Sequence, residues 1–168
     1  MTDEVVVRRA RTGDVRAIKA LVDGYAAKNI LLSKPLVTLY EDIQEFWVAE
    51  RGGQVLGCGA LHVLWEDIAE IRTIAVAEQA LGHRLGHRIV SQLLDVAGEL
   101  GLRRIFVLTF ETRFFARHGF VAIEGTPVSA EVYEEMRASA DEGMAEFLDL
   151  PYVKPNTLGN TRMLRQLI

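Results

Sequence analysis

The stretch Glu70-Ile71-Arg72-Thr73-Ile74-Ala75-Val76, followed after a short gap by Gly82-His83-Arg84-Leu85-Gly86, decides the fold class of this chain. The β-branched residues of the first part predict a strand over 68–76. The second part is a glycine-containing loop, and it opens an amphipathic helix whose apolar residues recur at helical spacing up to Leu100. The first N–H groups of a helix have no partner within it, and the helix dipole favours negative charge there. This order of elements is typical of a site that binds a pyrophosphate. The alternative is that the two glycines only make a tight turn.

Strands and helices alternate on both sides of this stretch. Arg51-Gly52-Gly53-Gln54 separates two β-rich runs and predicts a hairpin. Thr12 precedes apolar residues at helical spacing, so we expect it to cap a helix. The expected strands cover 5–7, 45–49, 55–65, 68–76, 104–109, 120–123 and 160–168, and the expected helices cover a segment after Thr12, a short one from Leu36, one from Leu85, 112–118 and 130–147. This order predicts a single α/β domain over residues 1–168 with a mixed sheet.

The composition is that of an ordinary globular chain. Of the 168 residues, 49% are hydrophobic and 25% are charged, which excludes the disordered class. The formal net charge of −4 gives no overall attraction to nucleic acid or to an anionic membrane. The charged N-terminus lacks the apolar core of a signal peptide, and no apolar run has the length of a membrane span. We therefore expect a soluble cytoplasmic protein with no nucleic-acid and no membrane partner.

The cysteine and histidine residues indicate no metal site. Cys58 is the single cysteine and lies in an apolar run, so we expect a small core residue rather than a nucleophile. The histidines show no spacing typical of metal ligands; they are His62, His83, His87 and His118.

Three segments, taken in order, resemble the GNAT superfamily of acetyltransferases. The strand that ends Ile74-Ala75-Val76 is similar to the family strand whose backbone lines the pantetheine arm. Leu81 to Gly86 lies where the family has its Q/R-x-x-G-x-G/A loop, and Phe114 to Phe120 is similar to its late F-[YF]-x-x-x-G-F segment. The resemblance implies the GNAT (acyl-CoA N-acyltransferase) fold, a mixed and mostly antiparallel sheet flanked by helices, and acetyl-CoA as cosubstrate without a metal. It implies CoA contacts from Ile74, Ala75, Val76, Leu81, Gly82, His83, Arg84, Leu85, Gly86, His87 and Phe115.

The loop departs from the family pattern at two positions. The family usually has Arg or Gln where this chain has Leu81, and Gly where it has Arg84. Glycine suits a loop whose backbone must come close to phosphate, because it has no Cβ. Arg84 can therefore hinder the approach of CoA, or it can point outward and add positive charge beside the phosphates.

A narrower resemblance points to the amino-acid N-acetyltransferases, in particular to the N-acetylglutamate synthases. The segments that carry it are Gly57 to Leu61, Glu70 to Arg72, Val107 to Thr109 and Asn160 to Leu164. The chain is similar to the short stand-alone type seen in actinobacteria, which lacks an amino-acid-kinase domain. This implies transfer of acetyl from acetyl-CoA to the α-amine of an amino acid, L-glutamate or L-glutamine, as the first step of arginine biosynthesis. The resemblance also suggests a homodimer.

Five residues are candidates for chemistry and for acceptor binding. Glu70 is the candidate general base, because the attacking amine must lose a proton; the alternative is an exposed strand carboxylate. Arg72 shares a strand face with Glu70 and can bind a substrate carboxylate or form a structural ion pair. By family resemblance, Lys34 and Thr161 contact the substrate, although Lys34 can equally be an ordinary surface lysine. Thr109 can donate a hydrogen bond to the leaving thiolate, and Phe115 stands where many relatives have a tyrosine acid.

Two other functions remain open at this point. An enzyme of the same fold can act on another small amine, such as a polyamine, or on a protein N-terminus. A polyamine would need acidic residues around the acceptor, whereas an amino-acid carboxylate needs basic ones. A non-catalytic module that senses CoA or amino acids would bind acetyl-CoA without releasing its thiol.

Overall fold

The computed structural model describes residues 4–149 and 159–167, which form two compact units. One unit holds residues 4–62 and 71–100, and the other holds residues 63–70, 101–149 and 159–167. Strands β3 and β4 contribute residues to both. The expectation of one domain over residues 1–168 stays a prediction.

The strands form a mixed sheet with the order β1-β2-β3-β4-β5-β7-β6. Strands β4 and β5 pair in parallel, whereas the pairs β1–β2, β2–β3, β5–β7 and β6–β7 are antiparallel. The mixed, mostly antiparallel sheet that the sequence predicts is therefore confirmed. The strand bounds are Val6–Arg9 (β1), Phe46–Arg51 (β2), Gln54–Trp65 (β3), Ile68–Val76 (β4), Arg104–Thr109 (β5), Val121–Ala122 (β6) and Thr161–Gln166 (β7).

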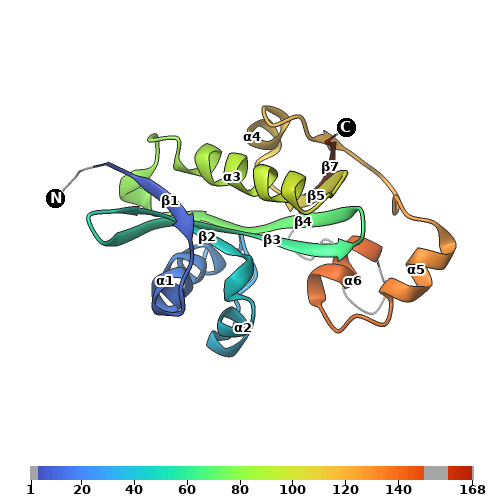
Figure 1. Ribbon diagram of the computed structural model, residues 1–168, viewed down its shortest axis with the longest axis horizontal. Coiled ribbons are helices and arrows are strands. Elements are labelled where there is room, and N and C mark those ends of the chain that lie inside the picture. Colours follow the sequence, from blue (N-terminus) through green and yellow to red (C-terminus); the bar gives the residue numbers. More distant parts are fainter. Residues whose placement is uncertain (1–3, 150–158, 168) are drawn as a thin grey trace. The chain divides into compact units, whose positions relative to one another are not determined.

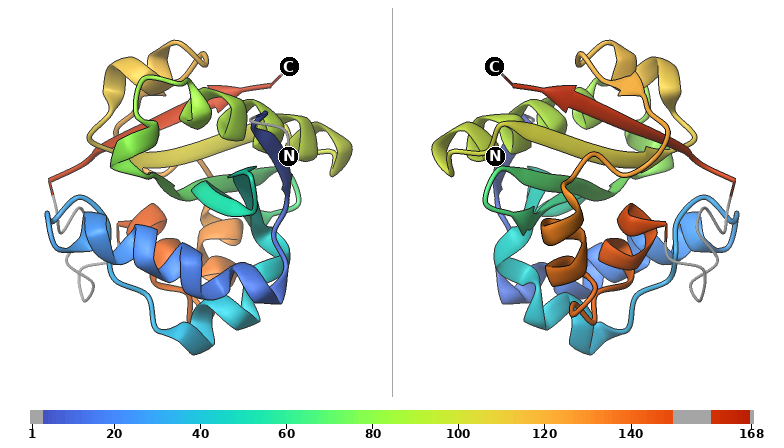
Figure 2. Two further views of the ribbon diagram at one scale, coloured as in Figure 1. Left: turned by 90° about the vertical axis from the view of Figure 1, so that its left-hand side faces the viewer. Right: turned by 90° about the vertical axis from the view of Figure 1, so that its right-hand side faces the viewer.

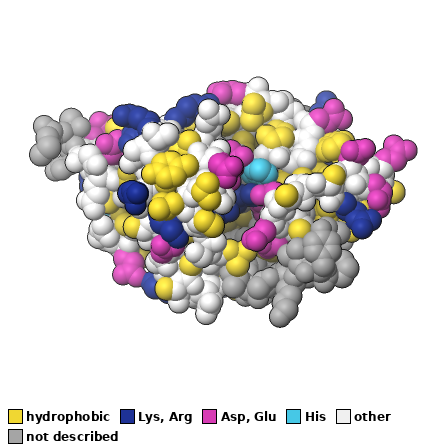
Figure 3. All heavy atoms as spheres, turned by 90° about the horizontal axis from the view of Figure 1, so that it is seen from below, with side chains coloured by type: hydrophobic (Ala, Val, Ile, Leu, Met, Phe, Trp, Pro, Cys, Tyr) yellow, Lys and Arg dark blue, Asp and Glu magenta, His cyan; other side chains and the backbone are white. Residues whose placement is uncertain are grey.

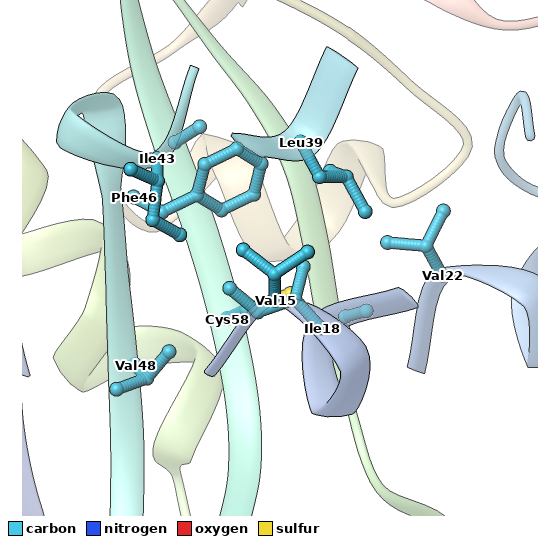
Figure 4. Close-up of a cluster of buried hydrophobic side chains, with 10 residues drawn as sticks. Val15, Ile18, Val22, Leu39, Ile43, Phe46, Val48 and Cys58 are labelled. Carbon is cyan, nitrogen blue, oxygen red and sulfur yellow. The ribbon is translucent and has the colours of Figure 1, made fainter. Parts of the chain in front are cut away.

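In the first unit, helices cover both faces of the sheet. Helices α1 (Val15–Ala26) and α2 (Leu36–Glu41) lie on one face, and α3 (Leu85–Glu99) lies on the other (Figure 1). Three 3₁₀ turns connect these elements: Thr12–Asp14 (η1), Ile43–Glu45 (η2) and Glu78–Ala80 (η3). Apolar side chains of α1, α2 and strands β2 and β3 interlock beneath the sheet (Figure 4). The buried members of this cluster are Val15, Ile18, Val22, Leu39, Ile43, Phe46, Val48, Cys58, Ala60 and Ala75.

Two glycines of β3 allow α3 to lie close to the sheet. A Cβ on Gly59 would lie 2.8 Å from Cγ2 of Ile89, and one on Gly57 would lie 3.0 Å from Cδ1 of the same residue. Both distances are shorter than an ordinary carbon–carbon contact. The alternating glycines in Gly57 to Leu61 are thus explained by the close packing of α3 on β3.

The second unit has its own core. Helices α5 (Ala130–Met136) and α6 (Glu142–Leu148) lie on one side of β5 and β7, and α4 (Thr112–Ala116) lies on the other (Figure 2). The rings of Phe106 and Phe147 pack edge to face with centroids 5.0 Å apart. This contact joins β5 to α6 within a buried apolar cluster, whose members are Leu64, Ile68, Phe106, Met136, Met144, Ala145, Phe147, Leu148 and Leu164.

Two helix predictions are wrong in detail. The stretch 130–147 is two helices rather than one, because Ser129 and Asp141 each cap a helix start by accepting a hydrogen bond from a backbone N–H. Thr12 is not a cap: it begins the turn η1, whose N-cap is Arg11. The carboxylate of Asp14 accepts the Arg11 N–H at 2.7 Å, and α1 starts only after it.

Other boundaries move by a few residues. The strand expected from Glu45 starts at Phe46 because Ile43–Glu45 is the turn η2, and the helix expected over 112–118 ends at Ala116. The last strand covers Thr161–Gln166, and Ile168 lies outside the described residues. No helix of the described chain combines the length and the apolar character needed to cross a membrane.

Candidate functional site

Strand β4 is locally irregular at Thr73, which has a φ of 60°. A β-branched residue rarely adopts this left-handed conformation, so the regular pleat is interrupted after Arg72. The Thr73 carbonyl accepts a hydrogen bond from the buried Cys58 thiol at 3.4 Å, and burial raises the pKa of that thiol to about 12. Cys58 is therefore the inert core residue that the sequence predicts.

After Thr73, successive side chains of the strand predicted to bind CoA again point to opposite faces of the sheet. Ala75 is buried in the core with α1, while Ile74 packs against Gly59 on the face that carries α3. The Tyr25 hydroxyl donates to the Val76 carbonyl at 2.6 Å, which ties the end of the strand to α1. The backbone of residues 74–76 is thus held from both faces of the sheet.

Helix α3 begins without a side-chain cap and has no acidic residue in its first turn. The Arg88 N–H donates to the Arg84 carbonyl at 3.1 Å. In any helix, the N–H groups of the first turn have no intrahelical acceptor one turn earlier. The preceding loop is exposed, and Gly82 takes a φ of 89° in it. An exposed, uncapped helix start of this kind is compatible with an anion site, and the predicted CoA contacts of this loop stay a prediction.

The backbone at Arg84 suits the glycine that the family pattern has at this position. It has a φ of 62° and a ψ of 22°, the left-handed conformation that glycine adopts without strain. Its side chain is exposed and lines a surface hollow together with residues 4–7 and the outer face of α3, where His87 and Arg88 also lie. Arg84 therefore lies at the border between the loop and this hollow, and which of the two alternatives holds for its side chain stays a prediction.

Charged side chains gather around Asp42 at the end of α2; with Lys34, Glu45, His62 and Arg72 they form what we call the Asp42 cluster. Nδ1 of His62 lies 2.8 Å from Oε1 of Glu45. Burial and the neighbouring Glu45 raise the pKa of Asp42, while His62, Lys34 and Arg72 act in the opposite direction. Two residues predicted to bind the acceptor, Lys34 and Arg72, thus act on the same carboxyl. On the face shown in Figure 3, acidic and basic side chains are interspersed rather than separated by sign.

In the second unit, Thr109 and Thr161 are brought together. They face each other at the ends of the antiparallel strands β5 and β7, and Thr109 is buried. The Glu111 N–H donates to Oγ1 of Thr109 at 2.8 Å, which leaves the hydroxyl hydrogen available to a further acceptor. Two predicted site residues far apart in the sequence are therefore neighbours.

Glu70 lies on the opposite face of this sheet. It is only 6% exposed, so the alternative of an exposed strand carboxylate is wrong. It pairs in register with Phe106, and paired residues of neighbouring strands point to the same face. Thr109 is three positions after Phe106 along β5 and therefore points the other way.

Phe115 is part of an aromatic core rather than a surface. It is 3% exposed, and its ring packs edge to face against Phe114 and Phe120 with centroids 4.9 and 5.3 Å apart. The aromatic residues of the late sequence segment thus stabilise α4 and the chain after it.

The model of the acetyltransferase (GNAT) family matches residues 21–120 of the chain. The chain belongs to this family. It is 68% identical over 162 residues to the amino-acid acetyltransferase of Mycobacterium tuberculosis, an alignment that covers 95% of this chain and 92% of that protein. It is therefore an enzyme of the amino-acid acetyltransferase type.

Solved structures of related GNAT proteins agree with the fold. The crystal structure of Rv2747 from Mycobacterium tuberculosis, in complex with CoA and NLQ, superposes with a TM-score of 0.93 at 67% identity and covers 97% of this chain and 99% of that chain. The N-acetylglutamate synthase from Neisseria gonorrhoeae, complexed with coenzyme A and N-acetyl-glutamate, gives a TM-score of 0.78 at 26% identity. That match covers 100% of this chain and 36% of the longer protein.

Sequence reasoning missed one charged residue of this acetyltransferase. Arg162 follows Thr161 on β7, and its guanidinium lies over the Phe106 ring, 5.3 Å from the centroid. An arginine directly before the apolar pair Met163-Leu164 of the predicted strand was the available signal. No group of three His, Cys, Asp or Glu side chains within residues 4–149 and 159–167 is arranged to hold a metal ion.

Proposed function

We propose that this enzyme transfers the acetyl group of acetyl-CoA to the α-amine of L-glutamate or L-glutamine. The observation that carries the proposal is the 68% identity, over nearly the whole chain, to an amino-acid acetyltransferase. A relative of 67% identity was crystallised with CoA and NLQ, and a more distant one with coenzyme A and N-acetyl-glutamate. The same reaction would make this enzyme the first of arginine biosynthesis.

Acetyl-CoA is assigned to the end of β4 and the start of α3. Backbone N–H groups of the first turn of α3 are donors for the pyrophosphate, and the positive end of the helix dipole adds to their attraction. The backbone of residues 74–76 receives the pantetheine arm, as the family resemblance implies. Leu81 to Arg84 complete the loop beside the phosphates.

The acceptor is assigned to Lys34, Arg72 and Thr161, as the family resemblance implies. Lys34 and Arg72 supply positive charge for a carboxylate of the amino acid, and the Thr161 hydroxyl supplies a hydrogen bond. A polyamine, which carries only positive charge, would be repelled by the same two side chains. An amino acid is therefore the better acceptor.

Glu70 is assigned as the general base and Thr109 as a donor to the leaving group. Because the two side chains point to opposite faces of the sheet, they would act from opposite sides of the reacting thioester. An α-amino group is largely protonated at neutral pH, so a base must take its proton, directly or through a water, before attack on the thioester. The free hydroxyl hydrogen of Thr109 can donate to the thiolate of CoA as it leaves. This division of roles matches the absence of a tyrosine at Phe115.

We further propose that the enzyme works in the cytoplasm as a homodimer. Sedimentation equilibrium at micromolar concentration tests the dimer, and a single monomeric species would contradict it.

A panel of acceptors assayed for CoA release tests the function. Glutamate and glutamine should release CoA much faster than spermidine or a peptide with a free N-terminus. The Glu70→Gln variant is the matched control, because it keeps the side-chain shape and removes the base. Binding of acetyl-CoA without release of thiol with any acceptor would favour a sensor instead.

A further inference from the structure

Arg162 is a partly buried cation, and the fold could be stable without a charged side chain at this position. Its guanidinium donates to the carbonyl oxygens of Phe147 at 2.6 Å and of Gly125, and it also lies over the ring of Phe106. Its Nε is buried and has no hydrogen-bond partner among the described residues. Burial lowers the pKa of Arg162, which means that the surroundings disfavour its charge. An apolar side chain of similar length could fill this space without burying a charge.

The contacts of Arg162 join three separate segments to one point of β7. Phe147 belongs to the last turn of α6, where unpaired carbonyls attract a cation. Gly125 lies in the loop after β6, and the Ile123 N–H donates to the Arg162 carbonyl at 2.9 Å. Helix α6, this loop and strand β5 therefore all meet at Arg162.

The position of this junction relates it to the proposed acceptor site. Thr161 is the first residue of β7, and its pairing with Thr109 is the last in register between β7 and β5. The end of a strand is the part most prone to local opening, so the position of Thr161 depends on what anchors its neighbour. Arg162 is the next residue and provides that anchor.

We propose that Arg162 is a positioning residue, which holds the start of β7 so that the Thr161 hydroxyl stays opposite Thr109 and oriented toward the acceptor. The inference rests on the proposed function, because it assumes that Thr161 contacts the amino acid. It predicts that loss of the guanidinium weakens acceptor binding more than it weakens the fold.

The test compares Arg162→Met, Arg162→Lys and Tyr133→Phe. Methionine keeps most of the side-chain length without the guanidinium, and lysine keeps the charge and one donor. Tyr133→Phe is the matched control, because the Tyr133 hydroxyl also donates to the end of α6, at the Leu148 carbonyl, 3.3 Å away, and this bond goes to α6 rather than to β7. The readouts are KM for the amino acid, KM for acetyl-CoA, kcat, and hydrogen exchange of the peptide that contains Thr161.

For Arg162→Met we expect KM for the amino acid to rise about tenfold, which corresponds to about 1.4 kcal/mol, with KM for acetyl-CoA little changed. Hydrogen exchange at Thr161 should be faster in Arg162→Met. Arg162→Lys should show a smaller rise in KM for the amino acid and a smaller increase in exchange, and Tyr133→Phe should show neither effect. Equal behaviour of Arg162→Met and Tyr133→Phe in both readouts would overturn the proposal, as would a uniform loss of stability with unchanged KM values. If the wild-type enzyme acetylates no amino acid, the proposed function fails, and the exchange measurement still decides whether Arg162 anchors Thr161.

Discussion

Replacing Arg84 by glycine should make the enzyme more stable. Arg84 has a φ of 62°, and a non-glycine residue in this conformation costs roughly 1–2 kcal/mol relative to its preferred one. Glycine removes that strain but makes the unfolded chain more flexible, which costs about 0.4–1 kcal/mol. The difference predicts a net gain of about 0.5–1 kcal/mol in the free energy of unfolding. For a chain of this size the melting temperature should rise by about 2–4 °C per kcal/mol.

The Arg84→Ala variant separates the backbone effect from the guanidinium. Alanine loses the same charge and keeps the left-handed strain, so it should show no gain in melting temperature. Since Arg84 lines the hollow beside α3, we expect its side chain to point away from the loop backbone, so both variants should bind acetyl-CoA with only a small loss, confined to low salt. Thermal unfolding and titration calorimetry at two salt concentrations measure these quantities. Equal melting temperatures for the glycine and alanine variants would refute the strain argument, and tighter binding by either would refute the outward orientation.

Three further changes test other parts of the structure. Glu70→Gln should lower kcat by about 10²–10⁴-fold, and the loss should shrink as pH rises and the amine deprotonates by itself; an unchanged rate at all pH values would assign Glu70 to structure. Asp42→Asn should increase the free energy of unfolding at neutral pH, because the raised pKa of Asp42 means that the folded state disfavours its ionised form. The gain should vanish as the pH falls below the pKa of Asp42 in the unfolded chain, where the carboxyl is protonated in both states. A gain that persists in acid would contradict the assignment. Gly59→Ala should destabilise by about 1–3 kcal/mol through contact with Ile89, whereas Gly98→Ala, in an open position on α3, should stabilise by about 0.5–1 kcal/mol; chemical denaturation that shows the same sign for both would contradict the packing account.

The central strands were predictable because their sequence signals are local and strong. The runs 68–76 and 104–109 are dense in β-branched and apolar residues, and both strands have the predicted bounds. The Gly52-Gly53 hairpin also follows from local chemistry, since both glycines take positive φ. The break in the stretch 130–147 was visible in principle, because a Ser-x-Asp sequence at 139–141 is a helix-start signal that the apolar periodicity on both sides obscured.

The site was predictable residue by residue but not as an arrangement. Which face of the sheet Glu70 and Thr109 point to depends on the register between β4 and β5, which the sequence does not encode locally. The left-handed backbone of Arg84 and the burial of Arg162 are likewise set by tertiary packing. The family resemblance indicated a role for each candidate residue, and the structure showed which residues lie beside it.

The fate of a labelled acetyl group tests the central claim most directly. The enzyme should be incubated with glutamate and acetyl-CoA carrying ¹³C in the acetyl carbonyl, and the products followed by NMR. We predict one new amide carbonyl signal, whose carbon is coupled to the α-proton of glutamate. This signal should grow in step with free CoA and be absent without the enzyme. Release of CoA with the label appearing only as free acetate, or no release at all, would contradict an amino-acid acetyltransferase.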